Sequence, residues 1–196
     1  MKEQQFEESK IQEPEQKSAP ETGRKRMLKD ILEWFFCIVL AVSVAFAIRG
    51  FVFTMIRVEG DSMLPTLQSN DRMVLWKLGY HPEKGDIIVL HQENHPPYIK
   101  RVIATEGQEV NIDFVRHKVY VDGVEQAEPF ILQPTAERGD VKFPVVVPED
   151  CVFVMGDNRN NSRDSRFSSV GMVQEKDITG KAVLRVYPFD KFGKVE

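Results

Sequence analysis

The stretch YIKRVIAT, residues Tyr98–Thr105, points most directly to the fold. Its β-branched and aromatic residues form a run of strand length, and side chains alternate between the two faces of a strand. The two predicted faces are Tyr98, Lys100 and Val102 on one side, and Ile99, Arg101 and Ile103 on the other. Each face therefore carries a cation among apolar neighbours. This pattern fits either an edge strand with both cations exposed or a buried strand whose cations have partners.

Runs of the same kind follow one another from residue 72 to the C-terminus and predict a mainly β domain. They are short, rich in β-branched and aromatic residues, and separated by Gly, Pro and Asn. The other runs are RMVLWKL, GDIIVLH, EVNIDF, HKVYVDGVE, CVFVMGD and KAVLRVYPF. Asp122-Gly123 predicts a tight hairpin, because a type I′ turn needs residues that tolerate positive φ. Residues 108–148 carry hairpin and proline signals but little chemistry, which indicates a small subsidiary β lobe.

The N-terminal part of the chain differs in composition and predicts a membrane anchor. Residues 1–30 are mostly polar and end in a basic cluster, so we expect a flexible cytoplasmic tail. WFFCIVLAVSVAFAI, from Trp34 to Ile48, carries no charge, and apolar flanking residues extend it toward the roughly 20 that a bilayer needs. We predict a single transmembrane helix over residues 31–48. The positive-inside bias then places residues 49–196 outside the cytoplasm.

Two other interpretations of the apolar run stay open. A buried core helix is one, although a helix that is apolar all round and preceded by basic residues fits a membrane better. A cleaved secretory signal is the other, because AFA at Ala45–Ala47 is a small-x-small pattern after a basic region and an apolar stretch. The long polar segment ahead of the basic cluster and the apolar FVFTMI after the run favour a retained anchor.

Charge and cysteine content exclude some classes of protein. The 196 residues carry a formal charge of −4, with a pI near 5.7, and so lack the basic face typical of nucleic-acid binders. Cys37 lies in the apolar run and Cys151 far downstream. A disulfide would join a membrane position to a soluble one, so we expect both thiols to be free.

The four histidines give little support for a metal site. His91 and His95 stand four residues apart, a spacing that binds zinc on a helix, but Pro96 and Pro97 follow directly. We see no third ligand in a recognised register. The two other histidines, His81 and His117, lie in polar stretches, and solvated loop positions are expected for them.

A catalytic nucleophile is a better candidate than a metal site. The first candidate residue lies in VEGDSMLPTL, Val58–Leu67. Pro65 disfavours helix at the residue before it, so Ser62 should lie in an extended or turning segment. A serine hydroxyl needs a neighbouring base to become a nucleophile. Lys100 can be that base if burial among apolar groups lowers its pKa from about 10.4.

A second polar stretch, MGDNRNNSRDSRFSS, follows the strand run CVFV. Most such stretches are only hydrogen-bonded loops. In an extended backbone, however, Ser162, Asp164 and Arg166 project to the same side, which places a hydroxyl beside an internally neutralised ion pair. Such a group can hold a neutral lysine without adding net charge.

Taken together, VEGDSMLPTL, KGDIIVL, YIKRVIATEGQEV and MGDNRNNSRDSR resemble the type I signal peptidase family, the membrane-anchored Ser/Lys peptidases of bacteria. The stretches occur in the family's order after an N-terminal anchor, and the similarity is poorest in the middle of the chain. The resemblance implies a Gram-positive-like form with one anchor. It also implies a signal-peptidase-like β domain that needs no metal or organic cofactor.

The resemblance also implies roles for individual residues. Ser62 is the expected nucleophile and oxyanion N–H donor, and Lys100 the expected general base. Ser162 is expected to hydrogen-bond the lysine and Asp164 to support that arrangement. Arg101, Asp157 and Arg166 are expected to maintain the site by ion pairing. Gly60 stands where some family members carry a hydroxyl residue that completes the oxyanion hole, which leaves the second donor open.

The implied partners are signal peptides of secretory preproteins, membrane lipid and the secretion translocon. Cleavage is expected after small-x-small (Ala-x-Ala) sites, on extended substrates. Two other classes of protein remain as alternatives. A self-cleaving Ser/Lys regulator similar to the LexA-like repressors would need a DNA-binding domain, which the chain does not offer. A membrane-anchored β domain that binds peptides without cutting them would need neither Ser62 nor Lys100.

Overall fold

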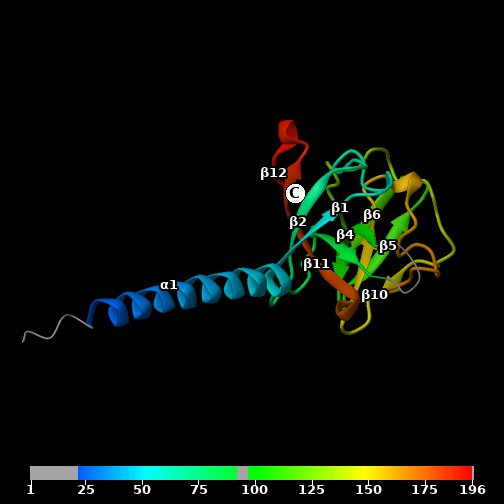
Figure 1. The fold of residues 1–196 in the computed structure, drawn as a ribbon. Helices are drawn as coiled ribbons and strands as arrows, with labels where there is room; N and C mark the ends of the chain where they lie inside the picture. Colours follow the sequence, from blue (N-terminus) through cyan, green and yellow to red (C-terminus); the bar gives the residue numbers. More distant parts are fainter. Residues whose placement is uncertain (1–21, 92–96, 196) are drawn as a thin grey trace, which may run out of the picture. The chain divides into compact units, whose positions relative to one another are not determined.

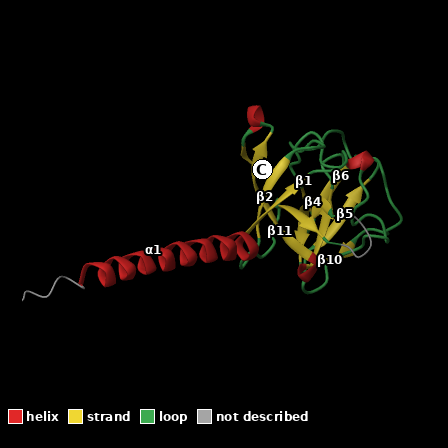
Figure 2. Ribbon diagram, viewed as in Figure 1, coloured by secondary structure: helices red, strands yellow, loops and turns green. Residues whose placement is uncertain are grey.

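The computed structural model describes residues 22–91 and 97–195 of the chain, which form an N-terminal helix and a β domain (Figures 1 and 2). Helix α1 spans Thr22–Ala47 and continues as one π-helical segment, η1, over Ile48–Val52. Within the described residues, Arg26–Val52 is the one helical stretch long and apolar enough to cross a membrane. At 1.5 Å per residue it is roughly 40 Å long, more than the roughly 30 Å of a bilayer core.

The predicted tail is too long, and the helix extends beyond the predicted membrane span of residues 31–48 at both ends. The flexible tail was expected to reach residue 30, but residues 22–30 are helical. Lys, Arg, Met and Leu dominate this stretch, and all are good helix formers, so the helix extends ahead of the apolar run. The rest of the predicted tail, residues 1–21, lies outside the described residues. At the other end, helical structure continues to Val52 rather than stopping at residue 48.

The β domain contains two antiparallel sheets (Figure 1). The larger has the strand order β1-β2-β11-β3-β4-β9-β10, and β12 also pairs with β11. Its strands are β1 (Phe53–Arg57), β2 (Arg72–Trp76), β3 (Ile87–Leu90), β4 (Tyr98–Thr105), β9 (Cys151–Met155), β10 (Val173–Gln174), β11 (Ile178–Tyr187) and β12 (Gly193–Lys194). The short helical turns are η2 (Arg159–Asn161), η3 (Glu175–Asp177) and η4 (Phe189–Lys191). The mainly β fold predicted from the sequence is thereby confirmed.

Strand β4 lies inside the large sheet, with β3 on one side and β9 on the other. Lys100 stands opposite Ile88 of β3, and Arg101 stands between Ile87 of β3 and Met155 of β9. Lys100 is 2% exposed and Arg101 is 3% exposed. The interpretation of this stretch as an edge strand with two solvated cations is therefore excluded, and each cation needs a partner.

The smaller sheet has the order β7-β6-β5-β8 and lies within residues 108–148. Its strands are β5 (Glu109–Asp113), β6 (Lys118–Val121), β7 (Val124–Glu125) and β8 (Val145–Val146). Asp122 and Gly123 have φ values of 52° and 75° and connect β6 to β7 as the predicted tight turn. Val110 and Val119 of this sheet share one apolar core with Phe153 of β9, so the small sheet packs onto the large one.

The thiols and histidines are not among the residues of the candidate active site described below. Cys37 of α1 and Cys151 of β9 are both free. His91 and His81 are exposed, His117 contacts the carbonyl of Thr135 through Nδ1 at 2.9 Å, and His95 lies outside the described residues. Residues 22–91 and 97–195 hold no group of three or more His, Cys, Asp or Glu side chains that could bind a metal ion.

Candidate active site

Ser62 lies in a loop that connects β1 to β2 and closes on itself. The amide of Val58 donates to the carbonyl of Asp71 at 2.8 Å, so the two ends of the loop are joined. Met63 and Leu67 are buried in the apolar core beneath the loop and anchor its middle. Ser62 itself sits in a turn and is half-buried. The loop therefore fixes a serine at the surface of the domain without covering it.

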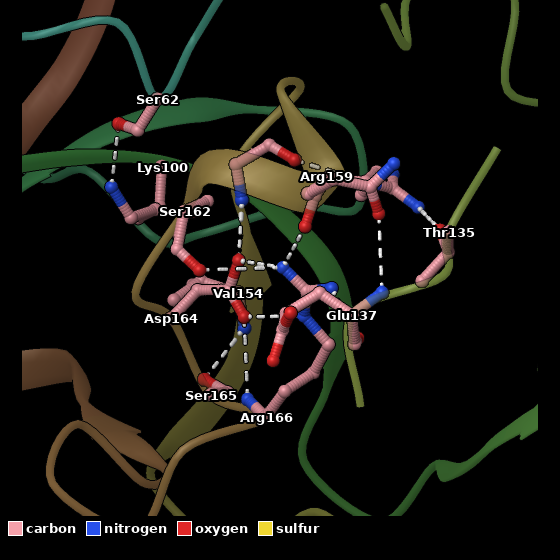
Figure 3. Close-up of polar contacts among 12 residues, drawn as sticks. Ser62, Lys100, Thr135, Glu137, Val154, Arg159, Ser162, Asp164, Ser165 and Arg166 are labelled. Atoms are coloured by element: carbon pink, nitrogen blue, oxygen red, sulfur yellow. Dashed lines mark hydrogen bonds and ion pairs between the residues drawn. The ribbon is translucent and has the colours of Figure 1, made fainter. Parts of the chain in front are cut away.

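Lys100 reaches this serine from β4. Its Nζ lies 2.8 Å from Ser62 Oγ (Figure 3). Nζ also donates to the carbonyl of Ile99 at 3.0 Å. The ring of Tyr98 lies 5.5 Å from Nζ. A neutral amine has two N–H donors and one lone pair. With one N–H on Ile99, the lone pair of a neutral Lys100 can accept the proton of Ser62.

Burial is the main cause of an unusual pKa at Lys100. It lowers the pKa from 10.5 to about 8, because a charged ammonium loses its hydration inside the protein. Among the nearby charges, Asp164 and Asp157 raise the pKa, whereas Arg166 lowers it. Because Asp164 is itself paired with Arg166, its field is largely cancelled and burial decides the outcome. At mildly alkaline pH a large fraction of Lys100 is neutral.

Asp164 and Arg166 form a fully buried pair beside the lysine. Arg166 Nε donates to Asp164 Oδ1 at 2.8 Å and Nη2 donates to Oδ2 at 2.9 Å (Figure 3). The remaining donors of Arg166 bind the carbonyls of Glu137 and Arg159 at 2.8 and 2.6 Å. Asp164 also accepts the amide of Gly156 at 3.0 Å. Through these hydrogen bonds the pair links three segments of the chain that surround the site.

The expected hydrogen bond from Ser162 to Lys100 is absent. Ser162 is buried, yet its Oγ makes no hydrogen bond to any described residue. In this structure Lys100 Nζ contacts Ser62 and the carbonyl of Ile99, and the contact with Ser162 that the resemblance implies is not formed. Ser162 Oγ instead packs closely against Gly156. Its hydroxyl is free to rotate toward a neighbour that lies in the site.

Arg101, the second buried cation of β4, is neutralised by Asp157. Arg101 Nε donates to Asp157 Oδ1 at 2.9 Å and Nη2 donates to Oδ2 at 2.8 Å. Its Nη1 binds the carbonyl of Gly85, and its guanidinium stacks on Phe130, 4.0 Å from the ring centroid. Thr66 Oγ1 donates to Asp157 Oδ2 at 2.5 Å, which ties the Ser62 loop to the same pair.

Several residues near the site were missed by the sequence analysis. Gly156 is closely packed: a Cβ there would lie 2.3 Å from Ser162 Oγ and 2.5 Å from the carbonyl oxygen of Ser62. Asn158 bonds the Ser62 loop. Both belong to the quoted MGDNRNNS stretch, whose density of hydrogen-bonding residues was the available signal. Glu128, which pairs with buried Arg159 at 2.6 Å, lies in the lobe predicted to carry little chemistry.

Gly60 is exposed, and its conformation explains the residue type. Its φ of +84° is in the region that favours glycine. A Cβ at this position would meet no atom within 4 Å, so backbone conformation rather than space opposes a side chain here. Gly60 offers no side-chain donor to the site.

Asp157→Ala should destabilise the protein by about 3–5 kcal/mol, because it leaves the buried Arg101 guanidinium without its counter-ion. Thermal unfolding of the detergent-solubilised chain measures this loss. As a control, Glu125→Ala removes an exposed pair with Lys118 and should cost less than about 1 kcal/mol. Equal stability losses in the two variants would contradict the structural importance of the Arg101–Asp157 pair.

Comparisons with known proteins show the family to which the chain belongs. A family model described as signal peptidase, peptidase S26, matches residues 31–187. Signal peptidase IB of Staphylococcus aureus strain COL is 34% identical over 184 residues, covering 85% of this chain and 94% of the relative. Signal peptidase I S of Bacillus subtilis strain 168 is 37% identical over 177 residues with the same coverage. A solved signal peptidase I from Enterococcus faecalis is 27% identical, with a TM-score of 0.44, covering 53% of this chain and 98% of that one.

A mainly β domain with this family match over most of its length defines a serine endopeptidase. More particularly, the chain belongs to the signal peptidase family, peptidase S26, and is a type I signal peptidase of the bacterial kind. Membership of this peptidase family therefore favours a signal peptidase over both alternative classes, the self-cleaving regulator and the non-catalytic binding domain.

Proposed function

We propose that the protein removes N-terminal signal peptides from exported preproteins by a Ser/Lys acyl-enzyme mechanism, with Ser62 as nucleophile and Lys100 as general base. The observation that carries the proposal is the 2.8 Å contact between Ser62 Oγ and the Nζ of a lysine that is 2% exposed. A lysine so buried loses its proton far more readily than one in water. A half-exposed serine beside it remains accessible to a polypeptide substrate.

The reaction follows from these positions. Neutral Lys100 accepts the Ser62 hydroxyl proton while Oγ attacks the carbonyl carbon of the scissile peptide. The resulting ammonium then gives its proton to the departing amine, which leaves the signal peptide esterified to Ser62. Lys100 next takes a proton from water while the hydroxide attacks the ester carbonyl. The bond to Ser62 Oγ then breaks, the signal peptide leaves as a carboxylic acid, and the Lys100 ammonium returns its proton to Ser62 Oγ. Nζ is neutral again after each complete cycle of proton transfers.

Charge balance around the base supports its role. The two carboxylates nearest Lys100, Asp164 and Asp157, are both engaged by buried guanidiniums. An unpaired carboxylate at either position would stabilise the ammonium and raise the pKa of Lys100. We therefore assign both ion pairs, Asp164–Arg166 and Arg101–Asp157, to keeping the lysine neutral and in place. Ser162, whose buried hydroxyl is unpartnered among the described residues, is assigned to contact the reacting groups transiently.

The proposed substrate specificity and location extend this assignment. Cleavage after small-x-small (Ala-x-Ala) sites, on substrates bound in an extended conformation, is the specificity we propose. Only ten positions separate the end of the helical anchor at Val52 from Ser62. A single-pass anchor with its basic N-terminal flank in the cytoplasm would hold the nucleophile near the outer membrane face, in contact with lipid and near the secretion translocon.

Cleavage of a purified preprotein by the detergent-solubilised full-length chain tests the proposal. We expect a cut after a small-x-small site, mapped by mass spectrometry, at a rate that falls by more than about a thousandfold in Ser62→Ala. Ser69→Ala removes an exposed hydroxyl from the same loop and should keep the wild-type rate. A Ser62→Ala protein that still cleaves would show that another group is the nucleophile.

A further inference from the structure

One residue, Asn158, holds both peptide groups that flank the α-carbon of Ser62. Its backbone amide donates to the Ser62 carbonyl at 2.9 Å. Its side-chain Nδ2 donates to the carbonyl of the preceding residue, Asp61, at 3.1 Å. Because a carbonyl oxygen only accepts, the atom of Asn158 that faces Asp61 must be the amide nitrogen. Asn158 is 8% exposed, although Asp61 lies at the surface.

Fixing the orientation of the Asp61 carbonyl also fixes the orientation of the Ser62 amide. The two groups belong to one planar trans peptide, so the C=O of Asp61 and the N–H of Ser62 point in opposite directions. The carbonyl of Asp61 also accepts the Leu64 amide at 3.2 Å within the loop, so the bond from Asn158 Nδ2 is the one that ties this carbonyl to a segment outside the loop. With the carbonyl held in this way, the N–H of Ser62 is directed away from Asn158. This N–H makes no hydrogen bond to any described residue. Among the residues that the structure describes, it is therefore an oriented donor that is available to an incoming acceptor.

Asn158 is itself held firmly enough to orient another group. The preceding residue, Asp157, is fully buried and paired with Arg101. The following residue, Arg159, is also fully buried and pairs with Glu128. The carbonyl of Asn158 accepts the amide of Asn161 at 3.0 Å. Neighbours on both sides therefore fix the position from which the Asn158 amide reaches Asp61.

We propose that Asn158 is a positioning residue that aims the Ser62 N–H at the oxyanion of the tetrahedral intermediate. The inference rests on the proposed function of Ser62 as nucleophile. A hydrogen bond accepted by the Asp61 carbonyl also polarises the shared peptide and strengthens the N–H as a donor. An aspartate of the same shape could not do this, because its carboxylate would face the carbonyl oxygen without a proton to donate.

Asn158→Ala provides the test, because it removes the side-chain donor and keeps the backbone one. Loss of an oxyanion donor typically costs about 10²–10³ in kcat. Here the donor is loosened rather than lost, so we expect kcat for a signal-peptide substrate to fall about 10- to 100-fold. KM should stay within about twofold, and the pH at which the rate is half-maximal should not move, because Lys100 is untouched. A peptide boronate, which forms an anionic tetrahedral adduct with Ser62, should bind more weakly by the same factor as kcat falls.

Asn160→Ala is the matched control. The Asn160 side chain makes four hydrogen bonds, to Gln133, Pro134, Ala136 and Glu137, and none to the Ser62 loop. This variant should lose stability yet keep kcat and boronate affinity. If Asn158→Ala folds poorly, isosteric Asn158→Asp, assayed on the high-pH plateau of the rate, gives the same comparison and should be at least as slow.

The possible outcomes separate this inference from the proposed function. Cleavage that survives Ser62→Ala in the same assay would remove the nucleophile and the inference with it. An inactive Ser62→Ala together with wild-type kcat and boronate affinity in Asn158→Ala would overturn only the role of Asn158. A changed KM, or a shifted half-maximal pH, with unchanged boronate affinity would also overturn it, because it would assign Asn158 to substrate binding or to Lys100.

Discussion

Lys100→Met should abolish preprotein cleavage and at the same time stabilise the folded protein below pH 8. Activity should fall by more than about a thousandfold, because the thioether cannot accept the proton of Ser62. The stability gain has a different cause. Below pH 8 the folded protein holds a buried ammonium whose pKa is lowered from 10.5 to about 8, and this costs about 3 kcal/mol of folding free energy. Methionine has a similar length and no charge.

The pH dependence of the gain distinguishes this cause from better packing. The unfolded chain binds its lysine proton up to about pH 10.5, whereas the folded chain releases it near pH 8. The penalty is therefore complete below pH 8, shrinks as the pH rises and disappears above 10.5. We expect Lys100→Met to raise the unfolding midpoint by about 6–12 °C at pH 6 and by progressively less toward pH 10.

Lys100→Arg is the companion variant. It keeps the charge at all accessible pH values and should be both inactive and less stable than wild type. A midpoint for Lys100→Met that is unchanged at pH 6, or a gain that does not depend on pH, would contradict a buried lysine with a lowered pKa.

Gly156→Ala is the second change from which we expect a large effect. A single added methyl group would lie 2.5 Å from the Ser62 carbonyl oxygen and 2.3 Å from Ser162 Oγ, closer than Cβ atoms approach either. The backbone beneath the nucleophile must therefore move. A displacement of about 1 Å at a reacting group can cost about a hundredfold in rate, and overpacking of this kind costs about 1–3 kcal/mol in stability. We expect both losses, measured by preprotein cleavage and thermal unfolding.

Gly193→Ala separates the local clash from a general effect of replacing glycine. Gly193 lies in β12, and a Cβ there would meet no atom within 4 Å. This variant should keep wild-type activity. Comparable activity in Gly156→Ala and Gly193→Ala would mean that the close approach of Gly156 to Ser62 does not constrain the reaction.

The strands of the β domain could be predicted because residue type and side-chain alternation within a short run indicate a strand. Seven runs of β-branched and aromatic residues, YIKRVIAT among them, correspond to strands, and Asp122-Gly123 forms its turn. Strand β1 was missed, since FVFTMI was taken as a continuation of the apolar run. The helix begins ahead of the predicted membrane span because composition marks where apolar residues begin, whereas helix propensity decides where the helix begins.

The site could be predicted only in part, because its contacts join segments far apart in the chain. Alternation showed that one of the two cations, Lys100 or Arg101, needed an explanation, but their partners, Ser62 and Asp157, are 38 and 56 residues away. The resemblance implied that Lys100 acts on Ser62 and that Arg101 forms an ion pair, but it did not name Asp157 as the partner of Arg101. It also implied a bond from Ser162 to Lys100 that this structure does not contain. No local pattern could indicate that Phe130, from the small lobe, stacks on Arg101.

The pKa of Lys100 tests the central claim most directly, because the mechanism needs a lysine that is neutral near the working pH. Selective isotopic labelling of lysine, with Lys100→Met to assign the resonance, allows its Cε chemical shift to be followed against pH by NMR in the detergent-solubilised full-length protein. The account predicts a midpoint of about 8, with the rate of preprotein cleavage rising through the same pH. A midpoint near 10.5 would mean that Lys100 stays charged beside Ser62, and Lys100 could not then be the base.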